Sequence, residues 1–273
     1  MSGYQTIRYE ERGAVAWITL DQPEVLHAFD TVMMREIHEC WSGLRDNDDV
    51  NAVVLTAEGD RAFCTGIDRG AAAIGEPDRP RDVGQRGATP LHVDDPGDWL
   101  PPKTAGRLWK PVIAAVNGMA CGGAFYLLGE ADIIIAADHA TFFDPHTTYG
   151  MASVFESMML LQRMPVGEVL RVALMGAHER MTAGRAHEVG LVQEVVPLDR
   201  LAEAAARVAD AIASQPARAV QATVRAVWYA QELGYRQALD VGKTLVQLGT
   251  DEKDLADGQA LFNSGRRIPW RAR

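Results

Sequence analysis

Apolar residues gather into four short runs in the first half of the chain. Each run is continuous and does not alternate with polar residues, which indicates strands that are covered on both faces. The runs occupy residues 14–20, 52–56, 112–116 and 132–136. Helical patterns separate most of them, and the sequence therefore predicts an α/β architecture.

The first helical pattern follows Asp30, whose side chain can cap the start of a helix. Four large apolar residues then recur at the spacing that puts them on one helix face. They are Met33, Ile37, Trp41 and Leu44. The pattern therefore predicts an amphipathic helix after Asp30.

The chain after residue 150 is predicted to be nearly all helix. Thr182 begins a helix that Gly190 can end, and residues 192–196 form a short strand. Further helices are expected over residues 198–214, 216–231, 233–247 and 251–263. We therefore expect a core of residues 1–196 followed by a C-terminal helical region of residues 197–273.

Residues 69–106 are rich in proline and glycine and have no clear periodicity. A long segment of this kind inside a compact domain is typical of a functional lid or a mobile loop. A surface excursion without a function fits the same composition. His92, Asp94 and Asp95 lie in this segment, but their spacing is not that of a metal site, and no metal site is predicted.

Charge and hydropathy exclude two classes of partner. The 273 residues include 27 Lys and Arg against 37 Asp and Glu, a formal net charge of −10. Such a chain gains no counterion release on nucleic acid, which makes that partner unexpected. Residues 111–128 are apolar and about as long as a membrane span, but Asn117 and several glycines interrupt them. We expect no membrane segment.

The cysteines bear on the compartment. Cys40, Cys64 and Cys121 are far apart in sequence, which fits neither a disulfide framework nor a paired-cysteine metal site. A reducing compartment agrees with this usage. Residues 1–11 are polar and of mixed charge, without the apolar stretch of a signal peptide. We expect a cytoplasmic protein.

Two glycine-containing loops carry the candidate chemistry. One is Cys64-Thr-Gly-Ile-Asp68 and the other contains Gly122-Gly123 at the start of a helix. Glycine lets a backbone approach a ligand closely, and a helix start offers unpaired N–H groups. Two such loops can direct two amides at one oxygen, which is the geometry of an oxyanion hole. The second loop lacks the lysine and the spacing of a phosphate-binding loop.

Together these loops resemble the crotonase family, the enoyl-CoA hydratase/isomerase superfamily. The resemblance covers most of the chain. It is most specific over residues 110–123, Lys-Pro-Val-Ile-Ala-Ala-Val-Asn-Gly-Met-Ala-Cys-Gly-Gly, and includes the Leu20-Asp-Gln-Pro23 and Asp132-Ile-Ile-Ile-Ala136 segments. It implies a spiral of repeated ββα units and a C-terminal helical region that builds a homotrimer or a hexamer, a dimer of trimers.

The resemblance also implies a coenzyme A thioester as substrate, with no permanently bound cofactor. The backbone N–H groups of Ile67 and Gly123 would bind the thioester oxygen as it becomes an enolate. Residues expected to contact coenzyme A are His27, Ala28, Thr65, Gly66, Asp68 and Gly122.

This sequence departs from the family at two positions where a typical hydratase has glutamates. Tyr126 stands three residues beyond the glycine pair, and His146 stands in the turn Asp144-Pro-His146. An unperturbed histidine titrates near neutral pH, so His146 can serve as a base or an acid, while Asp144 can orient it. Glu156 can supply the missing carboxylate, and Tyr126 can donate a hydrogen bond or a proton.

We therefore expect an acyl-CoA enzyme of the hydratase/isomerase type, in which His146 and Asp144 form a non-standard acid/base pair. Double-bond isomerisation needs one base, whereas hydration by the usual route needs two carboxylates, and both reactions stay open. A hydrolase of a β-diketone C–C bond or of a thioester, and a catalytically silent member of the family, are the alternatives.

Overall fold

The computed structural model describes residues 3–68, 84–85, 93–94 and 97–272. The chain forms two compact units, Met1–Ala213 and Ser214–Arg273, which are treated separately below. Much of the predicted lid segment lies outside the described residues, as do His92 and Asp95, so the role of that segment stays a prediction.

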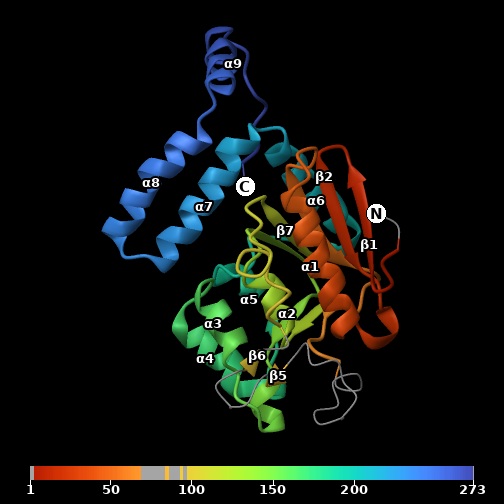
Figure 1. Cartoon of the computed structure of the whole chain (residues 1–273). Helices are drawn as coiled ribbons and strands as arrows, with labels where there is room; N and C mark the ends of the chain where they lie inside the picture. Colours follow the sequence, from red (N-terminus) through yellow and green to blue (C-terminus); the bar gives the residue numbers. More distant parts are fainter. Residues whose placement is uncertain (1–2, 69–83, 86–92, 95–96, 273) are drawn as a thin grey trace. The chain divides into compact units, whose positions relative to one another are not determined.

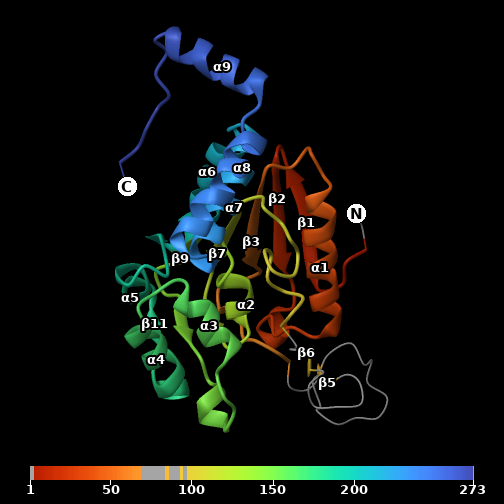
Figure 2. The same cartoon turned by 60° about the vertical axis from the view of Figure 1, so that its left-hand side comes forward.

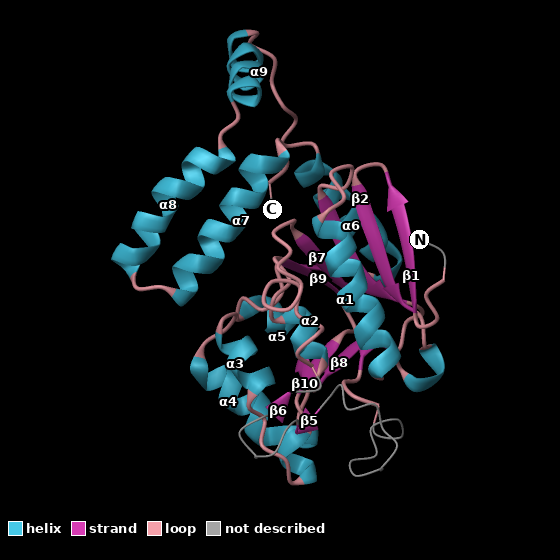
Figure 3. Ribbon diagram, in the orientation of Figure 1, coloured by secondary structure: helices cyan, strands magenta, loops and turns pink. Residues whose placement is uncertain are grey.

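The first unit is built on a six-stranded sheet (Figures 1 and 3). Its order is β1 (Ile7–Arg12), β2 (Val15–Leu20), β3 (Ala52–Ala57), β7 (Val112–Val116), β9 (Ile133–Ala137) and β12 (Glu194–Val196). β1 runs antiparallel to β2, and every other neighbouring pair is parallel. The four apolar runs therefore form strands as predicted.

A second, four-stranded sheet is formed by strands that alternate along the sequence with those of the large sheet. It contains β11 (Met181–Thr182), β10 (Thr141–Phe143), β8 (Met119–Cys121) and β4 (Ala62–Cys64). Consecutive strands alternate between the two sheets, because β3, β7 and β9 of the large sheet are followed by β4, β8 and β10 of the small one. This alternation is the repeated ββα unit that the resemblance implies. The short strands β5 (Gly84–Gln85) and β6 (Val93–Asp94) pair with each other.

Helices cover both faces of the large sheet, as the unbroken apolar runs predict (Figure 2). Alternate residues of β2 enter different hydrophobic clusters. Ile18 and Leu20 pack with α1 (Thr31–Arg45), whereas Val15 and Trp17 pack with α6 (Leu198–Ala213). Every second side chain thus points to the opposite face, and each face has its own core.

The predicted amphipathic helix is α1, and Asp30 caps it by accepting a hydrogen bond from the Met33 amide at 2.8 Å. The indole of Trp41 donates to the Leu100 carbonyl at 2.8 Å, which fastens the segment after residue 97 to this helix. Leu100 is fully buried. The end of the predicted lid, residues 97–106, therefore packs against the core.

The remaining helices of this unit follow the strands of the small sheet. They are α2 (Ala124–Leu128), α3 (Phe155–Leu161), α4 (Val166–Met175) and α5 (Ala183–Glu188), with 3-10 turns over Pro23–Val25, His146–Tyr149 and Gly176–His178. Thr182 caps α5 by accepting from the Arg185 amide, and Gly190 follows the helix end with a positive φ. Both positions agree with the prediction.

The second unit consists of α7 (Ala217–Glu232), α8 (Tyr235–Gly249) and α9 (Glu252–Asn263). A Cβ on Gly249 would come within 2.4 Å of the Ala222 Cβ, so α7 and α8 approach closely there. These helices match the predicted ones to within two residues at each end. The division at residue 197 stays a prediction, since α6 packs with the large sheet. None of the helices in the described ranges has the length and apolar character needed to cross a membrane.

Candidate active site

Three neighbouring strands of the small sheet bring the candidate residues to one edge. β8 is parallel to both β4 and β10, so the carboxyl ends of all three strands face the same way. Residues 65–68 follow β4, the Gly122-Gly123 pair follows β8, and the segment beginning at Asp144 follows β10. Ligands of open parallel sheets bind at this edge because the loops converge there.

The two glycine-containing loops touch. A Cβ on Gly66, whose φ is +85°, would lie 2.8 Å from the Gly123 nitrogen. Phe29 pairs with this loop by donating to the Gly66 carbonyl at 2.8 Å and accepting from the Asp68 amide at 2.9 Å. In such a parallel bridge the N–H of Ile67 points away from Phe29. Within the described ranges, the amides of Ile67 and Gly123 have no protein acceptor.

Asp144, His146 and Glu156 form one cluster beside these loops. Nδ1 of His146 is hydrogen-bonded to Oδ1 of Asp144, and its Nε2 lies 3.5 Å from Oε1 of Glu156. The Asp144 side chain is fully buried and that of Glu156 is 6% exposed, whereas the His146 side chain is 19% exposed. The imidazole is therefore the member of the cluster that solvent or a ligand can reach.

Helix α3 brings Glu156 to the cluster. Gly129, directly after α2, leaves room for α3, because a Cβ there would come within 2.5 Å of the Met159 Cβ. α2 and α3 lie side by side as a result (Figures 1 and 3). Glu156 falls in the first turn of α3, where the helix dipole favours a negative charge.

The environment of Asp144 keeps its carboxylate ionised. Burial by itself raises its pKa, but hydrogen bonds from His146 and Ser153 and the adjacent imidazole outweigh burial and lower the pKa below its ordinary value. The His146 amide also donates to Oδ1, at 3.1 Å. Since an ionised carboxylate only accepts, Nδ1 of His146 must carry a proton.

The cluster and the glycine loops meet at His146. A Cβ on Gly122 would lie 3.6 Å from Cε1 of the imidazole. Gly122 has a φ of +54° and its amide donates to the Phe143 carbonyl at 3.3 Å, which extends the ladder between β8 and β10. The sheet edge thus places the imidazole next to Gly122, which directly precedes Gly123, the residue whose amide is a candidate oxyanion donor.

The same three side chains are the group in the described ranges whose ligand atoms could hold a metal ion, since these atoms lie within 4.8 Å of one another. Both oxygens of Asp144 already accept hydrogen bonds, from His146 and from Ser153. These hydrogen bonds compete with a metal ion for the Asp144 oxygens, and the bond between Asp144 and Nδ1 of His146 is equally the arrangement of a proton-transfer pair.

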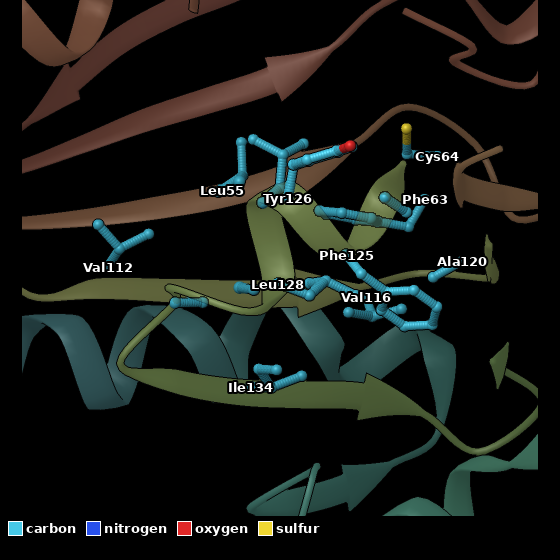
Figure 4. Packing of buried hydrophobic residues seen from close by; sticks show 14 of the residues in the cluster. Leu55, Phe63, Cys64, Val112, Val116, Ala120, Phe125, Tyr126, Leu128 and Ile134 are labelled. Atoms are coloured by element: carbon cyan, nitrogen blue, oxygen red, sulfur yellow. The ribbon is translucent and has the colours of Figure 1, made fainter. Parts of the chain in front are cut away.

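Tyr126 lies in a different environment from His146. Tyr126 is buried and belongs to the main hydrophobic cluster (Figure 4). A Cβ on Gly97 would come within 2.4 Å of three atoms of the Tyr126 ring, so Gly97 packs flat against it. Packing against residue 97 agrees with a space-filling role, and the catalytic role of Tyr126 stays a prediction.

His27 is engaged on both sides of its ring. Nδ1 accepts from the Gln22 amide at 3.1 Å, and Nε2 donates to the Glu58 carbonyl at 2.9 Å. Burial lowers its pKa, which agrees with a neutral ring in this role. The imidazole shapes the turn before α1, so any contact of His27 with coenzyme A would have to use backbone atoms.

The other predicted coenzyme A contacts lie at three places: Ala28 in the same turn, Thr65, Gly66 and Asp68 in the loop after β4, and Gly122 directly after β8. The Thr65 hydroxyl donates to the Leu26 carbonyl at 3.3 Å, and the Ala28 amide donates to the Val25 carbonyl at 3.1 Å. Residues 26–28 therefore lie against residues 65–68. The binding role of these residues stays a prediction.

Sequence reasoning did not single out Ser153 and Ser157. The Ser153 hydroxyl donates to Oδ2 of Asp144 and lies 2.5 Å from the Ser157 hydroxyl. Ser153 and Ser157 are four residues apart, with the start of α3 between them, and this spacing indicates that their side chains lie on the same side of the helix. It could not identify Asp144 as their partner, because that contact depends on how α3 packs.

Comparisons with known proteins give the family. The model of the enoyl-CoA hydratase/isomerase family matches residues 10–273. Among similar proteins is a carnitinyl-CoA dehydratase of Proteus mirabilis, 31% identical over 98% of this chain and 99% of its own length. The chain belongs to the enoyl-CoA hydratase/isomerase family. It is an enzyme of the crotonase superfamily, of the hydratase/isomerase type that processes acyl-CoA.

Other members of this family are similar over their full lengths. An (E)-benzylidenesuccinyl-CoA hydratase of Thauera aromatica is 29% identical over 96% of this chain and 97% of its own length. The crystal structure of an enoyl-CoA hydratase/isomerase from Mycobacterium paratuberculosis is 33% identical, covers 99% of both chains and has a TM-score of 0.80. The crotonase fold predicted for this chain is therefore confirmed, including the C-terminal helices.

Proposed function

We propose that this member of the enoyl-CoA hydratase/isomerase family moves a proton at the acyl group of a coenzyme A thioester, with His146 as the proton-transferring group. Asp144 orients the imidazole, and Glu156 is the second carboxylate. The observation that carries the proposal is the position of the His146 ring, between Glu156 on one side and Gly122 on the other.

In the first step, Nε2 of neutral His146 takes a proton from a carbon conjugated with the thioester carbonyl. The electron pair moves onto the thioester oxygen, where the amides of Ile67 and Gly123 are the proposed donors. Preorganised donors of this kind contribute about 3–4 kcal/mol each to the transition state. The buried carboxylate of Asp144 stabilises the imidazolium that forms.

Return of the same proton to another carbon moves the double bond, which is isomerisation. This reaction needs one base. A single histidine therefore suits isomerisation better than hydration, since hydration also requires a positioned water. Hydration remains open with Glu156, 3.5 Å from Nε2, as the group that activates the water. In both reactions the shared intermediate is the enolate.

The test is a comparison of His146→Ala and His146→Gln with His178→Ala, a matched change at an exposed histidine. Each protein is incubated with a short 2-enoyl-CoA in D2O, and deuterium uptake, double-bond migration and water addition are followed separately. General acid–base catalysis contributes about 100- to 10,000-fold, so both His146 variants are expected to fall by that range. Unchanged rates in the His146 variants would refute the proposal.

The Asp144–His146 pair also favours one alternative, hydrolytic cleavage of a β-diketone or a thioester. A carboxylate hydrogen-bonded to Nδ1 is the arrangement that lets an imidazole activate water. Retention on immobilised coenzyme A, together with no turnover of a cyclic diketone, would exclude the C–C hydrolase. A silent family member would bind the thioester with no exchange of its acyl protons.

We also propose that the protein assembles as a homotrimer or a dimer of trimers, with residues 197–273 contributing. The first unit exposes large apolar side chains on α3 and α4, and the second unit does so on α8 and α9. Those of the first unit include Phe155, Met158, Leu170 and Leu174, and those of the second Leu239, Val246, Leu255 and Phe262. Light scattering on the purified protein measures the mass of the assembly. Three or six times the mass of one chain is expected, and the mass of a single chain would refute the proposed assembly.

A further inference from the structure

We propose that Ser153 and Ser157 are positioning residues, whose paired hydroxyls hold the Asp144 carboxylate so that His146 keeps the tautomer its reaction needs. The inference deepens the proposed function and rests on it. It adds two residues to the acid/base cluster and makes α3 the element that fixes both nitrogens of one ring.

Counting donors and acceptors fixes the direction of the hydrogen bonds that link Ser157, Ser153, Asp144 and His146. The Asp144 carboxylate only accepts, so the single hydroxyl proton of Ser153 goes to its Oδ2. Ser153 must then accept from Ser157, 2.5 Å away. Protons point from Ser157 through Ser153 to Asp144, whose other oxygen accepts Nδ1–H of His146. Nε2 is left as the basic atom, on the side of Glu156.

The Ser153 hydroxyl is not used to begin the helix. Val154 is the residue before α3, and the helix start has no side-chain cap. The contacts of the Ser153 hydroxyl in the described ranges are Asp144 and Ser157. The position of the Ser153 hydroxyl is therefore set by its hydrogen bond to the buried Asp144 carboxylate and not by capping of α3.

The burial of Asp144 makes its carboxylate depend on the hydroxyl pair. Asp144 is fully buried, so its ionised form depends on protein donors. His146 supplies two of these donors, its ring N–H and its amide, and both act on Oδ1. Ser153 supplies the donor for Oδ2. Without it, one carboxylate oxygen loses its partner, and the carboxylate is free to rotate away from the ring.

Helix α3 therefore acts on His146 from two directions. Ser157 and Ser153 act through Asp144 on Nδ1, while Glu156 faces Nε2. Glu156 and Ser157 are consecutive residues of the same helix, so the position of α3 sets the environment of both ring nitrogens together. A shift of this helix would disturb the basicity and the orientation of the ring in one movement.

The experiment compares Ser153→Ala, Ser153→Thr and Ser157→Ala with Ser42→Ala, a change in the last turn of α1. Nitrogen-15 NMR of the histidine rings reports the His146 tautomer, and carbon-13 NMR of the aspartates reports the apparent pKa of Asp144. Rates of deuterium uptake by the enoyl-CoA give kcat and KM for each variant.

We expect Ser153→Ala to populate the Nε2–H tautomer, to raise the apparent pKa of Asp144 by about one unit, and to lower kcat about tenfold with KM unchanged. Ser153→Thr retains the hydroxyl and is expected to restore all three. Ser157→Ala is expected to change them in the same direction by less, because it removes only the second hydroxyl. Ser42→Ala is expected to leave them as in the wild type.

An unchanged tautomer and an unchanged Asp144 titration in Ser153→Ala overturn the inference, even if kcat falls. Loss of activity that Ser153→Thr does not restore also overturns it, since a packing role would behave in that way. The NMR readouts need no turnover, so they test the hydroxyl pair even if His146→Ala shows that His146 is not the catalytic base.

Discussion

Replacing Gly66 by alanine tests the proposed oxyanion hole directly, because the new methyl group would collide with one of its donors. The Cβ would lie 2.8 Å from the Gly123 nitrogen and 3.3 Å from the Cys121 carbonyl oxygen. Both neighbours are backbone atoms and cannot rotate aside. The loop after β4 must therefore move relative to Gly123, and the two amides lose their common direction.

Two costs follow from this change. The φ of +85° is unfavourable for alanine, which costs about 1–2 kcal/mol of stability. Loss of one oxyanion donor costs roughly 3–4 kcal/mol of transition-state stabilisation, a fall in kcat of about 100- to 1,000-fold. The second cost exists only if the amides of Ile67 and Gly123 act together on the substrate.

Gly59→Ala separates the two costs. Gly59 has nearly the same φ, +80°, but a Cβ there meets nothing within 4 Å. It should lose comparable stability in a urea titration and keep its kcat for proton exchange of an enoyl-CoA. If folded Gly66→Ala retains a kcat within about threefold of the Gly59→Ala value, the two amides are not an oxyanion hole.

Three further predictions concern buried ionisable groups. The lowered pKa of Asp144 contributes stability that is present above the ordinary Asp pKa of about 4 and is lost as pH falls through the folded value. The stability difference between wild type and Asp144→Asn, measured by urea titration, should therefore shrink below about pH 4. Lys103→Met removes the buried ammonium group that lies 2.7 Å from the Asp132 carboxylate, which keeps its hydrogen bond from the Val112 amide, and should cost about 3 kcal/mol in the same assay. Burial raises the pKa of the Cys64 and Cys121 thiols to about 12, so both should resist a thiol reagent at pH 8 until the chain unfolds.

Matched exposed residues provide the controls for these measurements. Asp49→Asn changes an exposed carboxylate and should leave the stability within about 0.5 kcal/mol of the wild type. Lys253→Met breaks an exposed ion pair with Asp257 and should change stability far less than Lys103→Met does. Rapid labelling of Cys64 in the folded protein would contradict the burial on which these predictions rest. So would a Lys103→Met variant whose stability equals that of the wild type.

The sequence was sufficient where local pattern and burial coincide. Strands β2, β3, β7 and β9 were predictable because an unbroken apolar run of that length is stable only when both faces are covered. Helix α1 was predictable from the Asp30 cap and its apolar face. β1 was missed, because Ile7–Arg12 is charged and polar. An edge strand tolerates such residues on its exposed side, and its pairing with β2 is a tertiary property.

The candidate site divides in the same way. Glycines at 66, 122 and 123, and a histidine two residues after Asp144, could be recognised from their sequence context alone. That three strand ends align, that α3 carries Glu156 to the imidazole and that Ser153 reaches Asp144 were decided by packing. Sequence patterns report each residue's own preference for helix, strand or turn, whereas a proton-transfer cluster depends on distances between elements, which only the packed core fixes.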